Sequence, residues 1–335
     1  MSIIASGWII WRPDPGLVKQ ERYEVERLLE AAPKNGYEVE VIDPGEIEII
    51  VNSHGEDGLL LRGKVIDPPD FMIPRMGSAT DYYMLAVMRH LEDLGVVTIN
   101  NADSVALAQD KLYHLQVLAA AGSPIPRTML VRFPISLETI EEQIGLPVVI
   151  KTLVGTQGSG VFLAKDREQL NDVLQFVEAN NPQAQLVLQQ YLEESKGRDI
   201  RILAIGGQVI AGMERRAKTG FKSNYSQGGE AVPFTTGPKN NMTVAAIMDQ
   251  LDMDMAGLDF LYDKEIGFRI CEVNSSPGFE GLEATCDVDV ADMVFKFLDV
   301  KFGISEYSKS RMLGTEYETP EGWKKVEKKG EDAEQ

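Results

Sequence analysis

The chain has 335 residues, a formal net charge of −19 and two cysteines. A chain of this length usually folds around more than one hydrophobic core, so we expect two or three packed units. The acidic balance argues against nucleic acid as a partner, because a phosphate backbone would be repelled rather than neutralised. No apolar run approaches the ~18 residues of a membrane helix, and the N-terminus lacks the features of a signal peptide. We therefore expect a cytoplasmic protein without a membrane partner.

Cysteine and histidine chemistry finds little support in the sequence. Cys271 and Cys286 are too few for a disulfide framework or a cysteine zinc site, and we expect two reduced thiols. The histidines His54, His90 and His114 share no metal-ligand spacing. Because no Ser-His-Asp or Cys-His arrangement is supported, the chemistry is expected to rest on positioning and electrostatics.

The first hundred residues alternate strand-like and helix-like segments. The pattern predicts strands at 3–10, 37–42, 71–75 and 96–100, and helices at 20–30 and 82–95. Strands that alternate with helices imply a parallel sheet covered on both faces. Ligands of such sheets bind beyond the carboxyl ends of the strands, and Arg75-Met76-Gly77 follows one of these ends.

The rest of the chain continues with both kinds of element. A helix over 103–120 is predicted to start at Asp103 or Ser104 and to end at Gly122. Further strands are expected at 147–152, 161–164, 185–191, 199–205, 208–216, 258–262 and 268–274, and helices at 167–179, 242–253 and 288–302. Residues 306–335 are polar and charge-mixed, which predicts a mobile or loosely docked tail.

The hairpin formed by the last two predicted strands carries candidate metal ligands. Glu272 and Asn274 are two residues apart and project from one face of their strand, whereas Cys271 projects from the other. Asp259, on the preceding strand, is expected roughly opposite Cys271 or Glu272. Two carboxylates that close repel one another unless a cation lies between them, and oxygen-only ligation suits Mg²⁺. The alternative is an exposed polar face of an antiparallel sheet.

A glycine-rich loop, Gly155-Thr156-Gln157-Gly158-Ser159-Gly160, follows Lys151 and joins two predicted strands. The lack of Gly-Lys-Ser/Thr excludes a Walker A loop, and a dinucleotide fingerprint would require a helix next. Small residues allow backbone amides to approach phosphate oxygens, and Lys151 supplies a cation. A simple glycine-rich turn is the alternative.

Four cations, Arg215, Arg216, Lys218 and Lys222, fall within eight residues of this acidic chain. That density is out of proportion to a solvated face. Arginine and lysine directed at a phosphoryl group or an oxyanion stabilise its charge. Asp199 and Arg201 place opposite charges on one face of their predicted strand, where a structural ion pair is the rival interpretation.

At these motifs the chain resembles the ATP-grasp superfamily and, within it, the RimK-type amino-acid ligases. The resemblance covers about residues 1–300 and rests on several motifs in order, which are more specific together than any one alone. The motifs are Ile73-Pro74-Arg75-Met76-Gly77, Asp110-Lys111, Val149-Ile150-Lys151 with the glycine-rich loop, Gln190-Tyr191, Asp199-Ile200-Arg201, Glu214-Arg215-Arg216-Ala217-Lys218, Ser223-Asn224, Gly228-Gly229, Asp259 and Glu272-Val273-Asn274-Ser275-Ser276-Pro277-Gly278.

The resemblance implies an α/β (α+β) ATP-grasp fold. Residues 1–101 would form a pre-ATP-grasp α/β substrate domain with a parallel sheet, and residues 102–188 a central subdomain with the glycine-rich loop as lid. Residues 189–305 would form the C-terminal subdomain with the metal site, followed by the tail at 306–335.

The activity implied is that of an ATP-dependent carboxylate–amine ligase working through an acyl phosphate. The amine would be glutamate or a similar amino acid, and the acceptor a carboxylate of a peptide, protein or small molecule. Alternatives are a D-alanine-type or carboxylase-like ATP-grasp ligase, or a Mg·ATP sensor without turnover. A homo-oligomer is compatible with the sequence.

The resemblance also assigns nucleotide contacts. Lys111 and Lys151 would bind ATP phosphates, the backbone of Gln190 and Tyr191 would hold adenine, and Asp199 would hold the ribose. Lys222, Ser223 and Asn224 would lie near the phosphates. The sequence departs from the family pattern twice, since the acid usual before Tyr191 is Gln190 and the position of Lys222 is more often Arg.

The remaining assignments concern metal and catalysis. Asp259, Glu272 and Asn274 would bind two Mg²⁺ ions, with Glu272 bridging them and Mn²⁺ able to substitute. Lys151, Arg201 and Arg215 would be catalytic, with the two arginines facing the acyl phosphate or a substrate carboxylate. Arg12 and Arg75 are further candidates for binding a substrate carboxylate, and surface ion pairing is the alternative for both.

Overall fold

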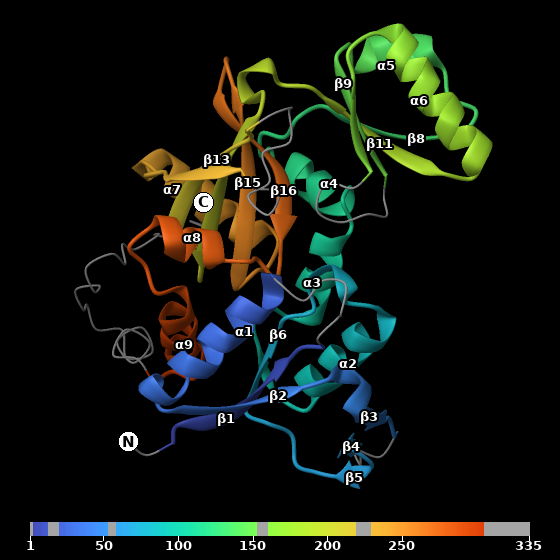
Figure 1. The fold of residues 1–335 in the computed structure, drawn as a ribbon. Coiled ribbons are helices and arrows are strands. Elements are labelled where there is room, and N and C mark those ends of the chain that lie inside the picture. The colour runs from blue at the N-terminus through green and yellow to red at the C-terminus, as the bar shows by residue number, and fades with distance from the viewer. Residues whose placement is uncertain (1–2, 13–19, 53–57, 153–159, 219–228, 305–335) are drawn as a thin grey trace, which may run out of the picture.

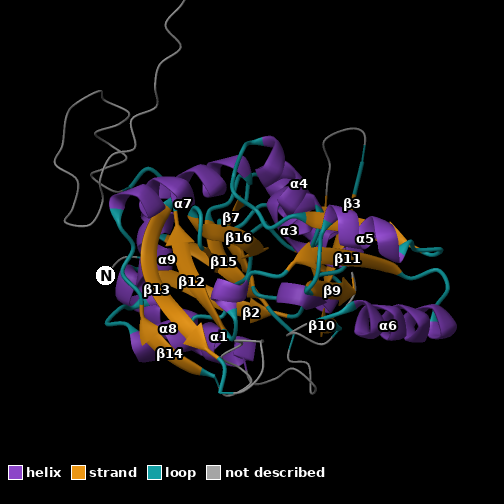
Figure 2. Ribbon diagram, turned by 90° about the horizontal axis from the view of Figure 1, so that it is seen from above, coloured by secondary structure: helices purple, strands orange, loops and turns teal. Residues whose placement is uncertain are grey.

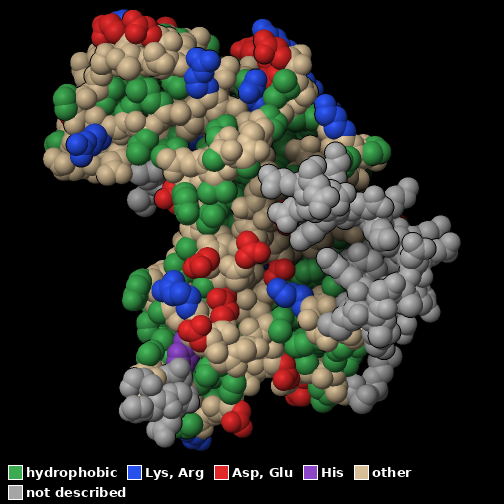
Figure 3. Space-filling view, turned by 180° about the vertical axis from the view of Figure 1, so that it is seen from behind, with side chains coloured by type: hydrophobic (Ala, Val, Ile, Leu, Met, Phe, Trp, Pro, Cys, Tyr) green, Lys and Arg blue, Asp and Glu red, His purple; other side chains and the backbone are tan. Residues whose placement is uncertain are grey.

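The structure is a computed structural model that describes residues 3–12, 20–52, 58–152, 160–218 and 229–304. Its ribbon separates into an N-terminal unit, a projecting lobe that holds α5 and α6, and a large C-terminal sheet between them (Figure 1). Seen from behind, the lobe projects from the remainder of the surface, over which acidic and basic side chains are interspersed (Figure 3). Across the described residues, no helix is long and apolar enough to cross a membrane.

The N-terminal unit contains the parallel sheet that the sequence predicts. Its strands β1 (Ala5–Ile10), β2 (Tyr37–Ile42), β6 (Phe71–Pro74) and β7 (Val97–Thr98) pair in the order β2-β1-β6-β7. Helices α1 (Gln20–Ala31) and α2 (Tyr82–Asp93) pack with opposite faces of this sheet. Alternate residues of β1 separate accordingly, because Ile9 joins the core that contains α1 and Ile10 joins the core that contains α2.

A small antiparallel sheet in this unit was not predicted from the sequence. It consists of β3 (Ile47–Ile50), β4 (Gly58–Leu61) and β5 (Lys64–Val65), in the order β3-β4-β5. The strands are short and half exposed, so their apolar periodicity is weak. His90 of α2 lies at hydrogen-bond distance from the carbonyl oxygen of Gly58, 3.1 Å, and so links this sheet to the parallel one.

The prediction of a single helix over 103–120 is wrong in one respect, because this segment forms two helices. They are α3 (Ala102–Gln109) and α4 (Tyr113–Ala120), and the N-cap of the first is Asn101, whose Oδ1 accepts from the amide of Ser104 at 2.8 Å. The break occurs at Asp110, whose carboxylate accepts from the amides of Leu112 and Tyr113 at 2.9 and 3.0 Å. A short acidic side chain that bonds nearby amides in this way competes with helix continuation.

The projecting lobe is a four-stranded antiparallel sheet with two helices beside it (Figure 2). Its strands are β8 (Thr128–Arg132), β9 (Val148–Thr152), β10 (Val161–Ala164) and β11 (Gln185–Gln190), in the order β10-β9-β11-β8. The helices are α5 (Leu137–Gln143) and α6 (Arg167–Asn180). Ile140, Leu170 and Leu174 of these helices share a core with Ile150 and Leu188 of the strands. The sequence predicted neither β8 nor α5.

The C-terminal sheet is antiparallel, in the order β14-β13-β12-β15-β16. Its strands are β12 (Arg198–Ile205), β13 (Gln208–Arg216), β14 (Glu230–Pro233), β15 (Met255–Asp263) and β16 (Gly267–Asn274). Helix α7 (Pro238–Gln250) packs with one face, and α8 (Glu280–Thr285) and α9 (Val290–Lys301) pack with the other. Helix α7 starts earlier than predicted because Pro238 occupies its first turn, where proline is favoured.

Candidate active site

The predicted phosphate-binding lysines approach the predicted metal strand from two other parts of the chain. Lys111, at the break between α3 and α4, donates through Nζ to the carbonyl oxygen of Thr152 at 3.1 Å, next to Lys151 on β9. Burial lowers the pKa of Lys111; Glu272 of β16 opposes this shift and Lys151 adds to it. Lys111, Lys151 and Glu272 therefore share one electrostatic environment, although they lie on three separate elements.

Lys151 is oriented by its neighbours on the lobe's sheet. Its Nζ donates to Oε1 of Gln189 at 2.8 Å, and Nε2 of Gln189 donates to Oγ1 of Thr128 at 3.1 Å. Gln189 is only 2% exposed, so this chain of hydrogen bonds is protected from water. The side chain of Lys151 consequently has a defined direction before any ligand binds.

The predicted adenine-binding segment lies where the lobe leads into the C-terminal sheet. Gln190 ends β11, and its amide donates to the carbonyl oxygen of Arg127 at 2.8 Å. Its side-chain oxygen accepts from the amide of Arg127 at 3.4 Å. Tyr191 is half-buried. Burial raises its pKa, and the nearby Glu193 adds a smaller increase. The two segments that connect the lobe to the rest of the protein are thus joined by hydrogen bonds between Arg127 and Gln190.

Four charged residues, of which Arg201 is half-buried and the others are buried, form a network across the middle of the C-terminal sheet. Arg215 donates through Nε and Nη2 to Asp199, both at 2.7 Å, and its Nη2 lies 2.9 Å from Asp259. Arg201 donates through Nε and Nη2 to Asp259, both at 2.8 Å. The sheet register produces these pairs, because Asp199 lies opposite Arg215 and Arg201 lies opposite Asp259. Two positive and two negative charges compensate each other, as buried charges require.

The network fixes the ionisation of its members. Burial by itself would raise the pKa of Asp259, but Arg201 and Arg215 outweigh it and hold that pKa well below its usual range. Burial would lower the pKa of Arg215, but Asp259 and Asp199 outweigh it and raise the pKa. Asp259 is therefore a carboxylate whenever the protein is folded near neutral pH, which a metal ligand must be.

The hairpin places the predicted metal ligands as the sequence indicated. Asp259 lies directly opposite Glu272, and a β-bulge follows Asp259. Glu272 is exposed and makes no hydrogen bond or ion pair with any described residue. The Oδ1 of Asn274 accepts from the amide of Ser276 at 3.0 Å. Cys271 and Cys286 are free thiols, as expected.

The oxygen atoms of this hairpin fit a hard divalent cation. Asp259 and Glu272 supply carboxylates and Asn274 supplies an amide, the ligand type that Mg²⁺ takes in proteins. Where the structure describes the chain, no group of three or more His, Cys, Asp and Glu side chains could hold a metal ion. A Mg²⁺ ion here would thus take ligands from the amide and from bound phosphates besides the two carboxylates.

Three buried side chains of the N-terminal unit hold the turn that follows β16. Oε1 of Glu24 on α1 accepts from the amides of Phe279 and Glu280 at 2.7 and 3.2 Å. Nη2 of Arg75 donates to the carbonyl oxygen of Pro277 at 3.0 Å. Nδ2 of Asn100 donates to the carbonyl oxygen of Ser275 at 2.8 Å. Since none of these side chains is more than 2% exposed, they form a clamp (Glu24, Arg75 and Asn100) between the N-terminal unit and the metal strand.

The sequence did not single out Glu24 or Asn100. The signals that could have found them are a glutamate next to the apolar positions of the first helix and an asparagine at the end of a predicted strand. Arg75 was proposed for a substrate carboxylate, and it lies buried against Phe279, with its guanidinium carbon 6.0 Å from the ring centroid. Burial lowers its pKa, although Glu24 and Glu21 oppose the shift.

Some predicted site residues lie outside the described residues. These are the glycine-rich loop from Gly155 to Ser159 and the segment with Lys222, Ser223 and Asn224.

Comparison with known proteins decides the family. A model described as "RimK-like ATP-grasp domain" matches residues 108–298, and one described as "RimK PreATP-grasp domain" matches residues 17–105. The chain belongs to the RimK-like ATP-grasp family. Members of this family are ATP-dependent ligases, and the chain is accordingly an ATP-dependent carbon–nitrogen ligase.

Relatives of this RimK-like chain support the assignment along most of its length. It is 36% identical over 279 residues to a probable alpha-L-glutamate ligase of Thioalkalivibrio sulfidiphilus, covering 83% of this chain and 91% of the relative. It is 37% identical over 287 residues to a probable alpha-L-glutamate ligase of Maridesulfovibrio salexigens, covering 84% and 93%.

Solved structures show the same fold. The ATP-grasp ligase PsnB, complexed with a phosphomimetic variant of a minimal precursor, Mg and ADP, matches with a TM-score of 0.68 at 19% identity, covering 90% of this chain and 100% of that one. D-alanine–D-alanine ligase of Bacillus anthracis matches with a TM-score of 0.62 at 19% identity, covering 91% and 99%. The predicted α/β ATP-grasp fold is confirmed.

Proposed function

We propose that this ligase uses Mg·ATP to activate a carboxylate of a peptide, protein or small molecule as an acyl phosphate and joins it to the amine of L-glutamate. The observation that supports this most directly is that Lys111 bonds the backbone next to Lys151 and interacts electrostatically with both Lys151 and Glu272, which lie on separate elements. Two cations beside an unpaired carboxylate suit a triphosphate with a divalent ion. L-Glutamate is chosen because the relatives cited above are probable alpha-L-glutamate ligases.

In the proposed reaction the nucleotide is held mainly by cations and backbone. Lys111 and Lys151 bind phosphate oxygens, the backbone at Gln190 and Tyr191 holds adenine, and Asp199 lies near the ribose. Asp259, Glu272 and Asn274 hold Mg²⁺, and we propose two ions with Glu272 as the shared ligand and Mn²⁺ as a substitute. Bound there, Mg²⁺ would offset the negative charge of the phosphates.

The bond changes follow from acyl-phosphate chemistry. A substrate carboxylate oxygen attacks the γ-phosphorus, the bond between this phosphorus and the β,γ-bridging oxygen breaks, and ADP leaves. The amine then attacks the acyl carbon and inorganic phosphate leaves. Arg201 and Arg215 use Nε and Nη2 within the buried network, so we propose that their Nη1 atoms face the acyl phosphate.

The metal assignment is tested by removing its unpaired carboxylate. Glu272→Ala is expected to abolish amine-dependent ADP release, because the proposed ions would lose their shared ligand. The readouts are a coupled ADP assay and circular dichroism, the latter to verify folding. Glu265→Ala, which removes an exposed acid from the turn of the same hairpin, is the control and should retain full activity. Undiminished ADP release by Glu272→Ala would refute the metal role.

The proposed contact of Lys151 with the ATP phosphates is tested in the same ADP assay. Lys151→Ala should lower kcat/KM for ATP by at least about 10²-fold, the usual effect of losing one electrostatic stabiliser. Lys165→Ala removes an exposed lysine that directly follows β10 and should have little effect. If the two variants behave alike, Lys151 has no role in ATP use.

A further inference from the structure

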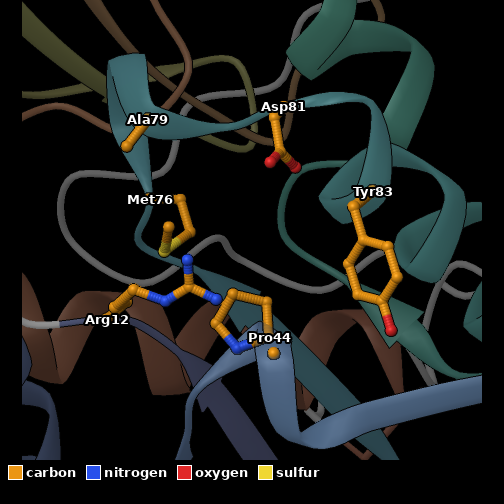
Figure 4. A pocket seen from close by; sticks show the side chains of 7 residues that line it. Arg12, Pro44, Met76, Ala79, Asp81 and Tyr83 are labelled. Carbon is orange, nitrogen blue, oxygen red and sulfur yellow. The ribbon is translucent and has the colours of Figure 1, made fainter.

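A pocket of about 260 Å³ with charged and apolar walls opens in the N-terminal unit (Figure 4). Arg12 and Asp81 supply its charged groups, while Pro44, Met76, Ala79 and the ring of Tyr83 supply much of the rest of its wall. This volume is at the small end of ligand pockets and suits a group the size of an amino acid rather than a nucleotide.

The pocket lies where the fold itself favours binding. Arg12 follows β1, Pro44 follows β2 and Met76 follows β6, so the pocket lies beyond the carboxyl ends of three parallel strands. The chain passes from β1 through α1 to β2 on one side, and β6 lies on the other side of β1. Ligands of open parallel sheets bind in the crevice at such a switch point.

Asp43 orients Arg12 through Nε and Nη2 of the guanidinium and does not contact Nη1. Its Nε lies 2.9 and 3.0 Å from the two carboxylate oxygens of Asp43, and its Nη2 lies 2.8 Å from Oδ1. Oδ1 of Asp43 is itself fixed, since it accepts from the amide of Gly45 at 2.7 Å. Figure 4 shows another nitrogen of Arg12 directed toward Met76 and the side of the pocket that carries Asp81. Among described residues this Nη1 has no hydrogen-bond partner, so no described residue uses its two donors.

Gly45 makes this arrangement of Arg12 possible. A Cβ atom at position 45 would lie 2.7 Å from Nη2 of Arg12, closer than such atoms approach one another. A larger residue would therefore require the guanidinium to shift. The glycine lets the arginine lie close to the backbone at position 45.

The charges around the pocket restrict its ligand. Arg12 carries one positive charge, whereas Asp43 and Asp81 carry two negative charges. The carboxylate of Asp81 uses Oδ1 to accept from the amide of Met84 at 2.9 Å and keeps Oδ2 free among described residues. A simple carboxylate at Arg12 would be repelled by Asp81, but a ligand that also brings an ammonium group would satisfy both residues.

We propose that this pocket binds the head group of the α-amino acid that serves as the amine, with its carboxylate at Nη1 of Arg12 and its amino group at Asp81. The proposal rests on the proposed function for the identity of the reaction, and it adds the place where the amine is recognised. The pocket adjoins the clamp in the sequence, because its lining residue Met76 directly follows Arg75. Arg75 in turn donates to the carbonyl oxygen of Pro277, in the turn that follows β16. Binding in the pocket would thus occur next to the segment that positions Asn274.

Direct binding tests this assignment. Isothermal titration calorimetry with L-glutamate is carried out on the full chain with Mg²⁺ and a non-hydrolysable ATP analogue. Arg12→Gln and Asp81→Asn should each raise the Kd for L-glutamate at least about tenfold, since each removes one charge-assisted contact. Asparagine is also a good helix N-cap, so Asp81→Asn changes the charge and not the start of α2.

Ligand variants separate the two contacts. N-acetyl-L-glutamate lacks the ammonium group and should bind the wild type weakly, with no further loss in Asp81→Asn. Ala79→Leu fills the pocket without altering a charge and should also weaken L-glutamate binding. Arg62→Gln is the matched control, because Arg62 is likewise an exposed arginine paired with acids, Glu40 and Glu46, in the same unit. It should leave the Kd unchanged.

The outcomes distinguish this proposal from the proposed function. If the wild type binds L-glutamate and Arg12→Gln, Asp81→Asn and Ala79→Leu bind it equally well, the amino acid binds elsewhere and the pocket assignment is overturned. Absence of any L-glutamate binding by the wild type overturns both the pocket assignment and L-glutamate as the amine, whereas equal binding by the variants overturns the pocket assignment alone. Failure to bind the ATP analogue would instead refute the Mg·ATP function, while the L-glutamate titration would still decide the pocket. Should Arg12→Gln not fold, Asp81→Asn and Ala79→Leu decide it.

Discussion

At the scale of single residues, His114 illustrates how burial changes a titratable group near the site. It lies on α4, three residues after Lys111, and is 2% exposed. Its Nδ1 lies 2.7 Å from the carbonyl oxygen of Asp110, and its Nε2 has no partner among described residues. Burial lowers the pKa of His114 from 6.5 to about 4, so the folded protein keeps the imidazole neutral over this interval.

Stability should therefore fall with acidification. Between the unfolded pKa of 6.5 and the folded pKa of about 4, the unfolded chain binds the proton and the folded chain does not. The free energy of unfolding thus loses up to about 3 kcal/mol from this group as pH falls through that window. Urea unfolding across the window should show a shallower loss in His114→Gln than in the wild type. Equal slopes would mean that His114 titrates normally in the folded protein.

At the scale of elements, the metal strand depends on residues of a different unit. The turn from Ser275 to Glu280 lacks regular structure until α8 starts, and its backbone is bonded by Glu24, Arg75 and Asn100. Because the turn starts where β16 ends, its position sets the direction in which Asn274 leaves the strand. The N-terminal unit consequently positions the end of β16, which carries the proposed metal ligand Asn274, without contributing a proposed ligand of its own.

Glu24→Ala should weaken both stability and metal use. The amides of Phe279 and Glu280 lose their acceptor, and the free energy of unfolding is expected to fall by about 2–4 kcal/mol. If the clamp positions Asn274, the Mg²⁺ concentration for half-maximal ADP release should also rise, an effect that a purely structural role would not produce. Glu26→Ala, an exposed position on the same helix, is the control. An unchanged Mg²⁺ requirement in Glu24→Ala would confine the role of Glu24 to stability.

At the scale of the whole molecule, Asn100 joins the N-terminal unit to the C-terminal sheet. Its Nδ2 donates to the carbonyl oxygens of Met255 and Ser275 at 2.7 and 2.8 Å. Its Oδ1 accepts from the amides of Asp254 and Met255, both at 2.8 Å. Asn100 is fully buried, so all four bonds are made in the absence of water. Aromatic packing supports the same interface, with Tyr37 of β2 5.4 Å from Phe295 of α9 between ring centroids.

Asn100→Ala is expected to destabilise the protein as a whole. Leaving buried backbone groups without partners should lower the free energy of unfolding by about 3 kcal/mol. Because the units share this interface, urea unfolding should keep a single transition at a lower midpoint. Asn180→Ala, at the end of α6 in the lobe, removes an exposed amide and should change stability little. A loss below about 1 kcal/mol in Asn100→Ala would show that the interface does not depend on this residue.

Local patterns in the sequence determined much of the fold and part of the site. Alternation along the strand put Glu272 and Asn274 on one face, and the hairpin placed Asp259 opposite Cys271 or Glu272; the register of β15 and β16 pairs Asp259 with Glu272. Such patterns are local because side chains two apart on a strand share a face whatever surrounds the strand. The break at Asp110 was missed, because the competing hydrogen bonds of one aspartate leave no periodic signal.

Only the tertiary structure decided which side chains meet. The family resemblance implied that Asp199 binds ribose and that Arg215 faces an acyl phosphate, and the fold pairs them with each other through the register of β12 and β13. It also brings Glu24 and Asn100 to the turn after the metal strand, over separations of 255 and 175 residues. Contacts at such distances depend on how the N-terminal unit packs against the C-terminal sheet, and no periodicity within a segment records them.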